Sequence, residues 1–204
     1  MHIIDDKKCS LKEASYDKEN KIYMVDSELE VCNFDNIKEW YVQNVVPFAN
    51  PNPKSNDALY FTENECYFIE FKNGKIDNSI NYELNKKIYD SLFILFDLDY
   101  TDCHGENVDT ISYTRENMNY ILVYNEERYI QAGETVQTIA GRKRQKVEIT
   151  ESQYRDKLFG TIRQLANEDF IKFGLDQFKN YLFKNVYTYT VKEFQEKFID
   201  MQKS

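Results

Sequence analysis

Residues that commonly bind zinc are scarce in this chain, which has four cysteines and two histidines among its 204 residues. These residues are Cys9, Cys32, Cys66, Cys103, His2 and His104. No two cysteines have the Cys-x-x-Cys spacing, and the two histidines do not complete a convincing zinc set with them. Cys66 lies within an apolar run, so we expect it to be a small core residue.

Long apolar segments are also missing. No run approaches the roughly 18 apolar residues that a membrane helix requires. Residues 1–8 lack the apolar core of a signal peptide. The sequence therefore predicts a cytoplasmic protein with no membrane partner.

A basic excess is absent as well, since the formal net charge is −9. A nonspecific nucleic-acid binder usually carries the opposite sign, because phosphate neutralisation supplies most of its affinity. One compact basic run, at residues 141–146, interrupts this acidity. It fits a solvated loop, or a loop in which Arg142, Lys143, Arg144 and Lys146 reach a phosphate backbone.

Apolar periodicity predicts a mixed α/β fold, a central β-sheet flanked by helices. Helical spacing covers residues 34–45, with Asp35 as a candidate cap, and residues 80–96. Strands are expected at residues 21–25, 57–61, 66–72 and 120–124. Two further helical stripes follow, and they consist of Tyr154, Leu158, Ile162 and Leu165, then Ile171, Leu175, Phe178 and Leu182.

The C-terminal end carries a capping box, because Thr190 precedes Glu193 by three residues at the start of a last short helix. The preceding residues 187–189 fit an extended segment.

We divide the chain into an N-terminal segment (1–33) with an edge strand, an α/β core (34–125), a polar loop or hairpin (126–149) and a helical C-terminal extension (150–204).

A predicted hairpin in the first third of the chain contains the candidate catalytic residues. Asp57 begins one apolar strand, and Glu70 and Lys72 end the next strand before an Asn-Gly turn. Side chains alternate between the faces of a strand, so Glu70 and Lys72 share a face and Phe71 points to the other. Two acids and a lysine at a strand end are the groups that metal-assisted phosphodiester cleavage needs.

Asp57 and the Glu70-Phe71-Lys72 segment together resemble the PD-(D/E)XK nuclease superfamily, over about residues 34–124. The chain departs from the literal motif because Asn56, not proline, precedes Asp57. The resemblance implies an αβββαβ core with the acids on a mixed sheet.

The resemblance also implies a function, a nuclease that acts on DNA or RNA with Mg²⁺ or Mn²⁺. Asp57, Glu70 and the backbone carbonyl of Phe71 would hold the cation, since hard cations favour oxygen ligands. Lys72 would assist the attacking water and stabilise the transition state. By position alone, Glu39 and Lys87 are the auxiliary candidates.

Two other interpretations stay open. Glu70 and Lys72 fit an exposed ion pair on an edge strand, which would contribute only about 0–1 kcal/mol. The acidic charge and the sixteen tyrosines also suit an inactive nuclease-like scaffold that binds a protein partner, as an immunity protein or inhibitor does. A homodimer is compatible with any of these functions.

Overall fold

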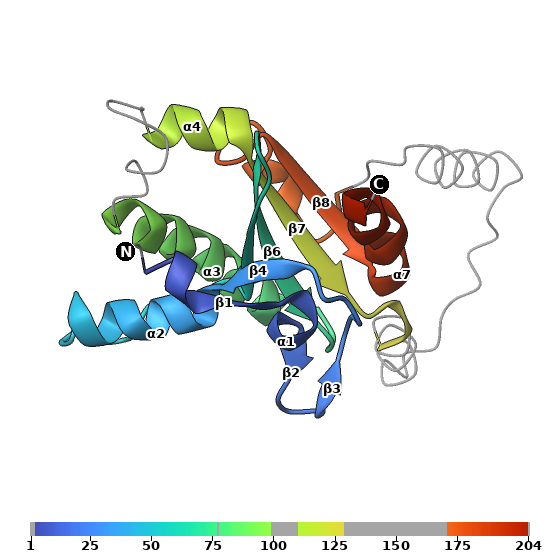
Figure 1. The fold of residues 1–204 in the computed structure, drawn as a ribbon, viewed down its shortest axis with the longest axis horizontal. Helices are drawn as coiled ribbons and strands as arrows, with labels where there is room; N and C mark the ends of the chain where they lie inside the picture. Colours follow the sequence, from blue (N-terminus) through green and yellow to red (C-terminus); the bar gives the residue numbers. More distant parts are fainter. Residues whose placement is uncertain (1–2, 77, 99–109, 129–170, 204) are drawn as a thin grey trace, which may run out of the picture.

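The computed structural model describes residues 3–76, 78–98, 110–128 and 171–203. It has a six-stranded mixed sheet flanked by helices (Figure 1), which confirms the predicted fold class. The sheet has the order β1-β4-β5-β6-β7-β8. Its strands are β1 (Lys8–Ser10), β4 (Glu30–Asn33), β5 (Ala58–Phe61), β6 (Cys66–Lys72), β7 (Met118–Tyr124) and β8 (Asn185–Thr190). A separate two-stranded sheet pairs β2 (Tyr16–Asp17) with β3 (Ile22–Tyr23).

The α-helices of the described chain are α1 (Leu11–Ala14), α2 (Phe34–Asn44), α3 (Asn78–Asp97), α4 (Thr110–Asn117) and α7 (Val191–Phe194). Single turns of other helix types, labelled η, are η1 (Asp5–Lys7), η3 (Leu175–Phe178), η4 (Gln195–Ile199) and η5 (Asp200–Lys203). The predicted helix at 34–45 is confirmed, although Asn33 and not Asp35 caps it through a bond from the backbone N–H of Asn36.

The predicted hairpin forms the centre of the sheet. Strand β5 pairs with β6 in antiparallel register, with Leu59 opposite Phe68. Strand β7 then pairs parallel to β6, after the long helix α3 has crossed between them. Strands β4, β5 and β6 are antiparallel neighbours, but α2 lies between β4 and β5 in the chain. The element order therefore differs at this point from the αβββαβ order that the resemblance implies.

Side chains of β6 alternate between two layers of the core, and helices lie on both faces of the sheet (Figure 1). Phe68 packs with buried residues of α2 and α3, and its ring meets that of Phe34 edge-on at 5.0 Å. Ile69 and Phe71 pack in the opposite layer with Phe194 of α7. Glu70 follows Phe68 by two residues, so it points to the α3 side of the sheet.

The N-terminal part contributes more to the sheet than the sequence suggested. Strands β1 and β4 both lie in the main sheet, and neither was expected. The strand predicted at 21–25 shortens to β3, which pairs with β2 in the projecting hairpin (Figure 1). Residues 1–33 thus extend the sheet, and a boundary drawn at residue 34 cuts through it.

The C-terminal part also differs from the prediction. The capping box at Thr190 and Glu193 is confirmed, with both reciprocal bonds present, and a helix follows it. The helical stripe predicted from Ile171 to Leu182 is wrong, because only the single turn η3 forms there. Residues 185–190 form β8, parallel to β7, so the extension completes the sheet. The stripe from Tyr154 to Leu165 lies outside the described residues.

Within the described ranges, no helix combines the length and the apolar character needed to cross a membrane.

Candidate functional site

Asp57 lies directly before β5, where β6 extends beyond the start of its neighbouring strand. Strand β6 is longer than β5, so its last residues, from Glu70 to Lys72, extend past the start of β5. The N–H of Phe71 has no β5 backbone opposite it and donates instead to Oδ2 of Asp57 at 2.7 Å. The backbone of Asp57 is itself fixed, since its N–H donates to Ile69 and its carbonyl accepts from Phe34.

Glu70 and Lys72 share the α3 side of β6, as the sequence predicted. Glu70 is fully buried, and its Oε1 lies 3.3 Å from Nζ of Lys72, which is 20% exposed. Strand β6 lies inside the sheet between β5 and β7. The alternative of a solvent-exposed ion pair on an edge strand is therefore wrong.

Lys87 of α3 completes the charged cluster. Its Nζ lies 2.6 Å from Oε1 of Glu70 and 3.4 Å from Oδ1 of Asp57. The three groups predicted from the hairpin and the auxiliary lysine thus converge, with Lys87 between the two acids. We refer to Asp57, Glu70, Lys72 and Lys87 as the charged cluster.

Hydrogen bonds to α3 fix the segment that leads into Asp57. The N–H of Asn56 donates to the hydroxyl of Ser91 at 2.8 Å. The residue just before Ser91 on the helix, Asp90, accepts from the N–H of Lys54 at 2.7 Å. These bonds hold Asp57 beside Lys87, although 30 positions separate them in the chain.

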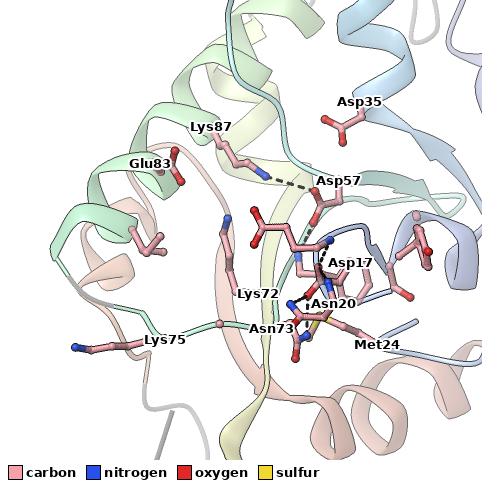
Figure 2. Close-up of a pocket in the computed structure, with 17 residues that line it drawn as sticks. Asp17, Asn20, Met24, Asp35, Asp57, Lys72, Asn73, Lys75, Glu83 and Lys87 are labelled. Atoms are coloured by element: carbon pink, nitrogen blue, oxygen red, sulfur yellow. Dashed lines mark hydrogen bonds and ion pairs between the residues drawn. The ribbon is translucent and has the colours of Figure 1, made fainter. Parts of the chain in front are cut away.

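A cavity of about 340 Å³ opens at this cluster (Figure 2). Asp57, Lys72 and Lys87 line it, whereas Glu70 lies behind them, buried beneath Lys87. The cavity wall carries five acidic and three basic side chains. The acidic members are Asp17, Glu19, Asp35, Asp57 and Glu83, and the basic members are Lys72, Lys75 and Lys87.

The electrostatics of the cluster favour a further positive charge. Burial and the negative charge of Glu70 raise the pKa of Asp57 to about 7, although Lys87 and the N–H of Phe71 oppose the rise. Burial alone lowers the pKa of Lys87, but the charges of Asp57 and Glu70 outweigh it, and the pKa rises above its ordinary value. The second oxygen of Glu70, Oε2, is buried and has no hydrogen-bond partner among the described residues. Lys72 and Lys87 both contact Oε1, so Oε2 is the oxygen of Glu70 that is left for a further ligand.

The raised pKa of Asp57 predicts that stability falls as the pH rises. In an unfolded chain an aspartate has a pKa of about 4, so between about pH 4 and pH 7 only the folded state holds this proton. The contribution is fully present below that range and is lost as the pH passes 7. We expect urea unfolding in chelator to show a larger drop from about pH 5 to about pH 8 for the wild type than for Asp57→Asn. Equal drops in the two proteins would refute the raised pKa.

The other predicted site residues have different positions. Glu39 is exposed and does not line the cavity; Asp35, one turn earlier on α2, lines it instead and accepts a bond from Ser55 at 2.5 Å. Glu39 was chosen by its position on the preceding helix alone, and the acid of α2 that lines the cavity lies four residues earlier. The basic residues Arg142, Lys143, Arg144 and Lys146 lie outside the described residues.

The oxygen donors of the cluster fit a hard divalent cation. Asp57 and Glu70 both reach one point, now occupied by Nζ of Lys87, and Oε2 of Glu70 has no partner in the described part of the chain. The carbonyl of Lys72 accepts from Asn125 on the β7 side, so the carbonyl of Phe71 points to the opposite edge, toward Asp57. Within the described chain no group of three or more His, Cys, Asp or Glu residues could hold a metal. A cation here would need water or substrate oxygens as well, which is usual for Mg²⁺.

Comparisons with protein-family models, curated proteins and solved structures found no match to this chain.

Proposed function

We propose that this protein is a metal-dependent nuclease that cleaves phosphodiester bonds at the charged cluster. The observation that carries the proposal is the convergence of Asp57, Glu70 and Lys72 from two strands with Lys87 from α3. The excess of acidic over basic side chains in the cavity wall supports a cation. A bare phosphate would be repelled there, whereas a cation would bridge it to the carboxylates.

Each residue has a role in this proposal. Asp57, Glu70 and the carbonyl of Phe71 hold Mg²⁺ or Mn²⁺, which when bound would polarise the phosphate and activate water. Lys72 lines the cavity and stabilises the charge that develops on the phosphate oxygens. Lys87 holds the two carboxylates together before the cation binds, because its Nζ contacts both. We also propose that the protein is cytoplasmic, as expected from its sequence. DNA is the substrate that we favour over RNA.

The test is cleavage by the chelator-treated protein with magnesium added back. Circular single-stranded DNA, double-stranded plasmid and RNA are the substrates. We expect cleavage of at least one of them that requires the metal and stops when chelator is added. Failure to cleave any of them with Mg²⁺ or Mn²⁺ would refute the proposal.

A second candidate is an inactive scaffold that binds a protein, as an immunity protein or inhibitor does. One observation favours it, since the Lys87 ammonium occupies the point between the two acids. The net charge of −9 suits a basic partner. A stable partner that is retained after Glu70→Gln and Lys72→Ala, together with absent cleavage, would favour this function.

A further inference from the structure

Two exposed tyrosines lie on the hairpin that borders the candidate site. Tyr16 and Tyr23 are directly opposite each other on β2 and β3. Their ring centroids are 4.8 Å apart with a 42° tilt, and the residues are 39% and 51% exposed. Ile22, beside them, is also 39% exposed. Two adjacent, partly exposed aromatic rings form an apolar surface that water solvates poorly.

The hairpin is held rigidly against the site. Asp17 accepts a bond from the side chain of Asn73 at 2.6 Å, and Asn73 directly follows Lys72 at the end of β6. Asp17 also accepts from the backbone N–H groups of Glu19 and Asn20, at 2.9 and 3.0 Å, which fixes the turn of the hairpin. Figure 2 shows Asp17, Asn20 and Asn73 grouped beside Lys72 and Asp57. A fixed hairpin presents its rings without a large ordering cost.

A second contact ties the hairpin to β7. The guanidinium of Arg128 donates to the side chain of Asn20 at 2.9 Å, and Asn125, just after β7, donates to Asn73 at the same distance. The hairpin therefore contacts residues at the ends of both central parallel strands. The contacts of Asp17 with Asn73 and of Asn20 with Arg128 therefore fix the position of the hairpin relative to Lys72.

The tyrosines border two cavities that share a wall. Tyr16 lines the cavity of the charged cluster, and Tyr23 lines a second cavity of about 360 Å³. Met24 and Asn73 line both cavities. Volumes of this size suit small ligands or parts of a chain such as single nucleotides. A nucleotide strand with one phosphate at the charged cluster would bring a neighbouring base to the tyrosine pair.

We propose that the Tyr16–Tyr23 pair is a base-stacking subsite, so that the substrate is single-stranded nucleic acid or has unpaired nucleotides next to the cleaved bond. This inference rests on the proposed nuclease function. Every base has an aromatic face, and base–aromatic stacking is the usual source of sequence-tolerant binding to single strands. In a duplex these faces are covered by neighbouring bases. The acidic net charge also favours a single strand, because a duplex has a higher density of phosphate charge and is repelled more strongly.

Binding without cleavage tests the subsite. Fluorescence anisotropy in calcium would compare the wild type with Tyr16→Leu/Tyr23→Leu and with the matched Tyr16→Phe/Tyr23→Phe protein, which keeps both rings. The probes are a single-stranded oligonucleotide of about 8 nucleotides, the same strand in a duplex, and the same strand with its central bases removed. A DNA set and an RNA set distinguish the two sources of an unpaired base.

We expect the wild type to prefer the intact single strand over both the duplex and the abasic strand. The leucine variant should weaken single-strand binding by about 5- to 150-fold, and the phenylalanine variant by much less. The abasic strand removes the bases instead of the rings, so it tests the subsite even if the leucine variant folds poorly. Equal wild-type binding to the intact and abasic strands would overturn the inference.

Cleavage assays on the same proteins separate the two proposals. Magnesium-dependent cleavage without any preference for unpaired bases would retain the nuclease and reject the tyrosine subsite. Ring-dependent binding without cleavage would retain the subsite as a nucleic-acid-binding surface and reject the nuclease. Absence of binding to every probe would overturn the subsite.

Discussion

Lys72→Ala is expected to reduce magnesium-dependent cleavage by at least about 100-fold while the protein remains folded. Removal of one group that stabilises transition-state charge typically lowers kcat by about 100- to 1,000-fold. Lys72 contacts Glu70 at 3.3 Å and lines the cavity, as the role requires. Its side chain lines an existing cavity, so truncation to alanine enlarges that cavity and does not open a new one in the core. The measurement is kcat on the best substrate at saturating magnesium.

Lys75 provides the matched control for this change. It lines the same cavity and has the same charge, but it is exposed. Lys75→Ala therefore changes the overall potential of the cavity to the same extent. We expect a loss of only a few-fold, mainly in KM, because a screened surface charge acts on encounter more than on chemistry. Equal losses in the two variants would contradict the role of Lys72.

Lys87→Met is expected to give the largest loss of stability in the protein, about 3–5 kcal/mol at pH 8. The lysine compensates two carboxylates at once, and Glu70 beneath it is fully buried. Methionine fills a similar volume but leaves both acids without their common partner. The loss should shrink at about pH 5, where Asp57, with its pKa raised to about 7, is protonated. Urea unfolding at the two pH values measures both effects.

Lys86→Met is the control on the neighbouring residue. Lys86 pairs with Asp90 one turn along the helix at 2.6 Å, and both side chains are partly exposed. Pairs of this kind contribute less than about 1 kcal/mol. Added magnesium should stabilise Lys87→Met more than the wild type, because the cation would replace the missing ammonium between the acids. Similar losses for the two methionine variants would show that Lys87 does not neutralise the cluster.

The sequence predicted the hairpin and its charges well, for a physical reason. Strand alternation fixes that Glu70 and Lys72 share one face, whatever surrounds them. The sequence left open whether this hairpin lies at an edge of the sheet, and the structure places β5 and β6 at its centre. Lys87 was nominated by position alone, and α3 brings it between the acids because its apolar stripe sets which face meets the sheet.

Other parts of the site depend on long-range packing that no local pattern contains. Residues 187–189 were expected to be extended, but their place in the sheet was not, because they pair with β7 only in the folded chain. The short strands β1 and β4 carry too few residues for a clear alternation. Asp35 was expected to be a helix cap. It lines the cavity instead, and the segment before β5 contacts it through the hydroxyl of Ser55. The tyrosine pair likewise depends on the register between β2 and β3.

The most direct test of the central claim is calorimetric titration of Mn²⁺ into the chelator-stripped protein with a phosphorothioate oligonucleotide bound. The same titration is made with Asp57→Ala and Glu70→Ala, and circular dichroism checks that each variant is folded. The account predicts saturable binding by the wild type that both substitutions abolish, since the two carboxylates would form one site. Absence of manganese binding by the wild type, or binding that survives both substitutions, would contradict it.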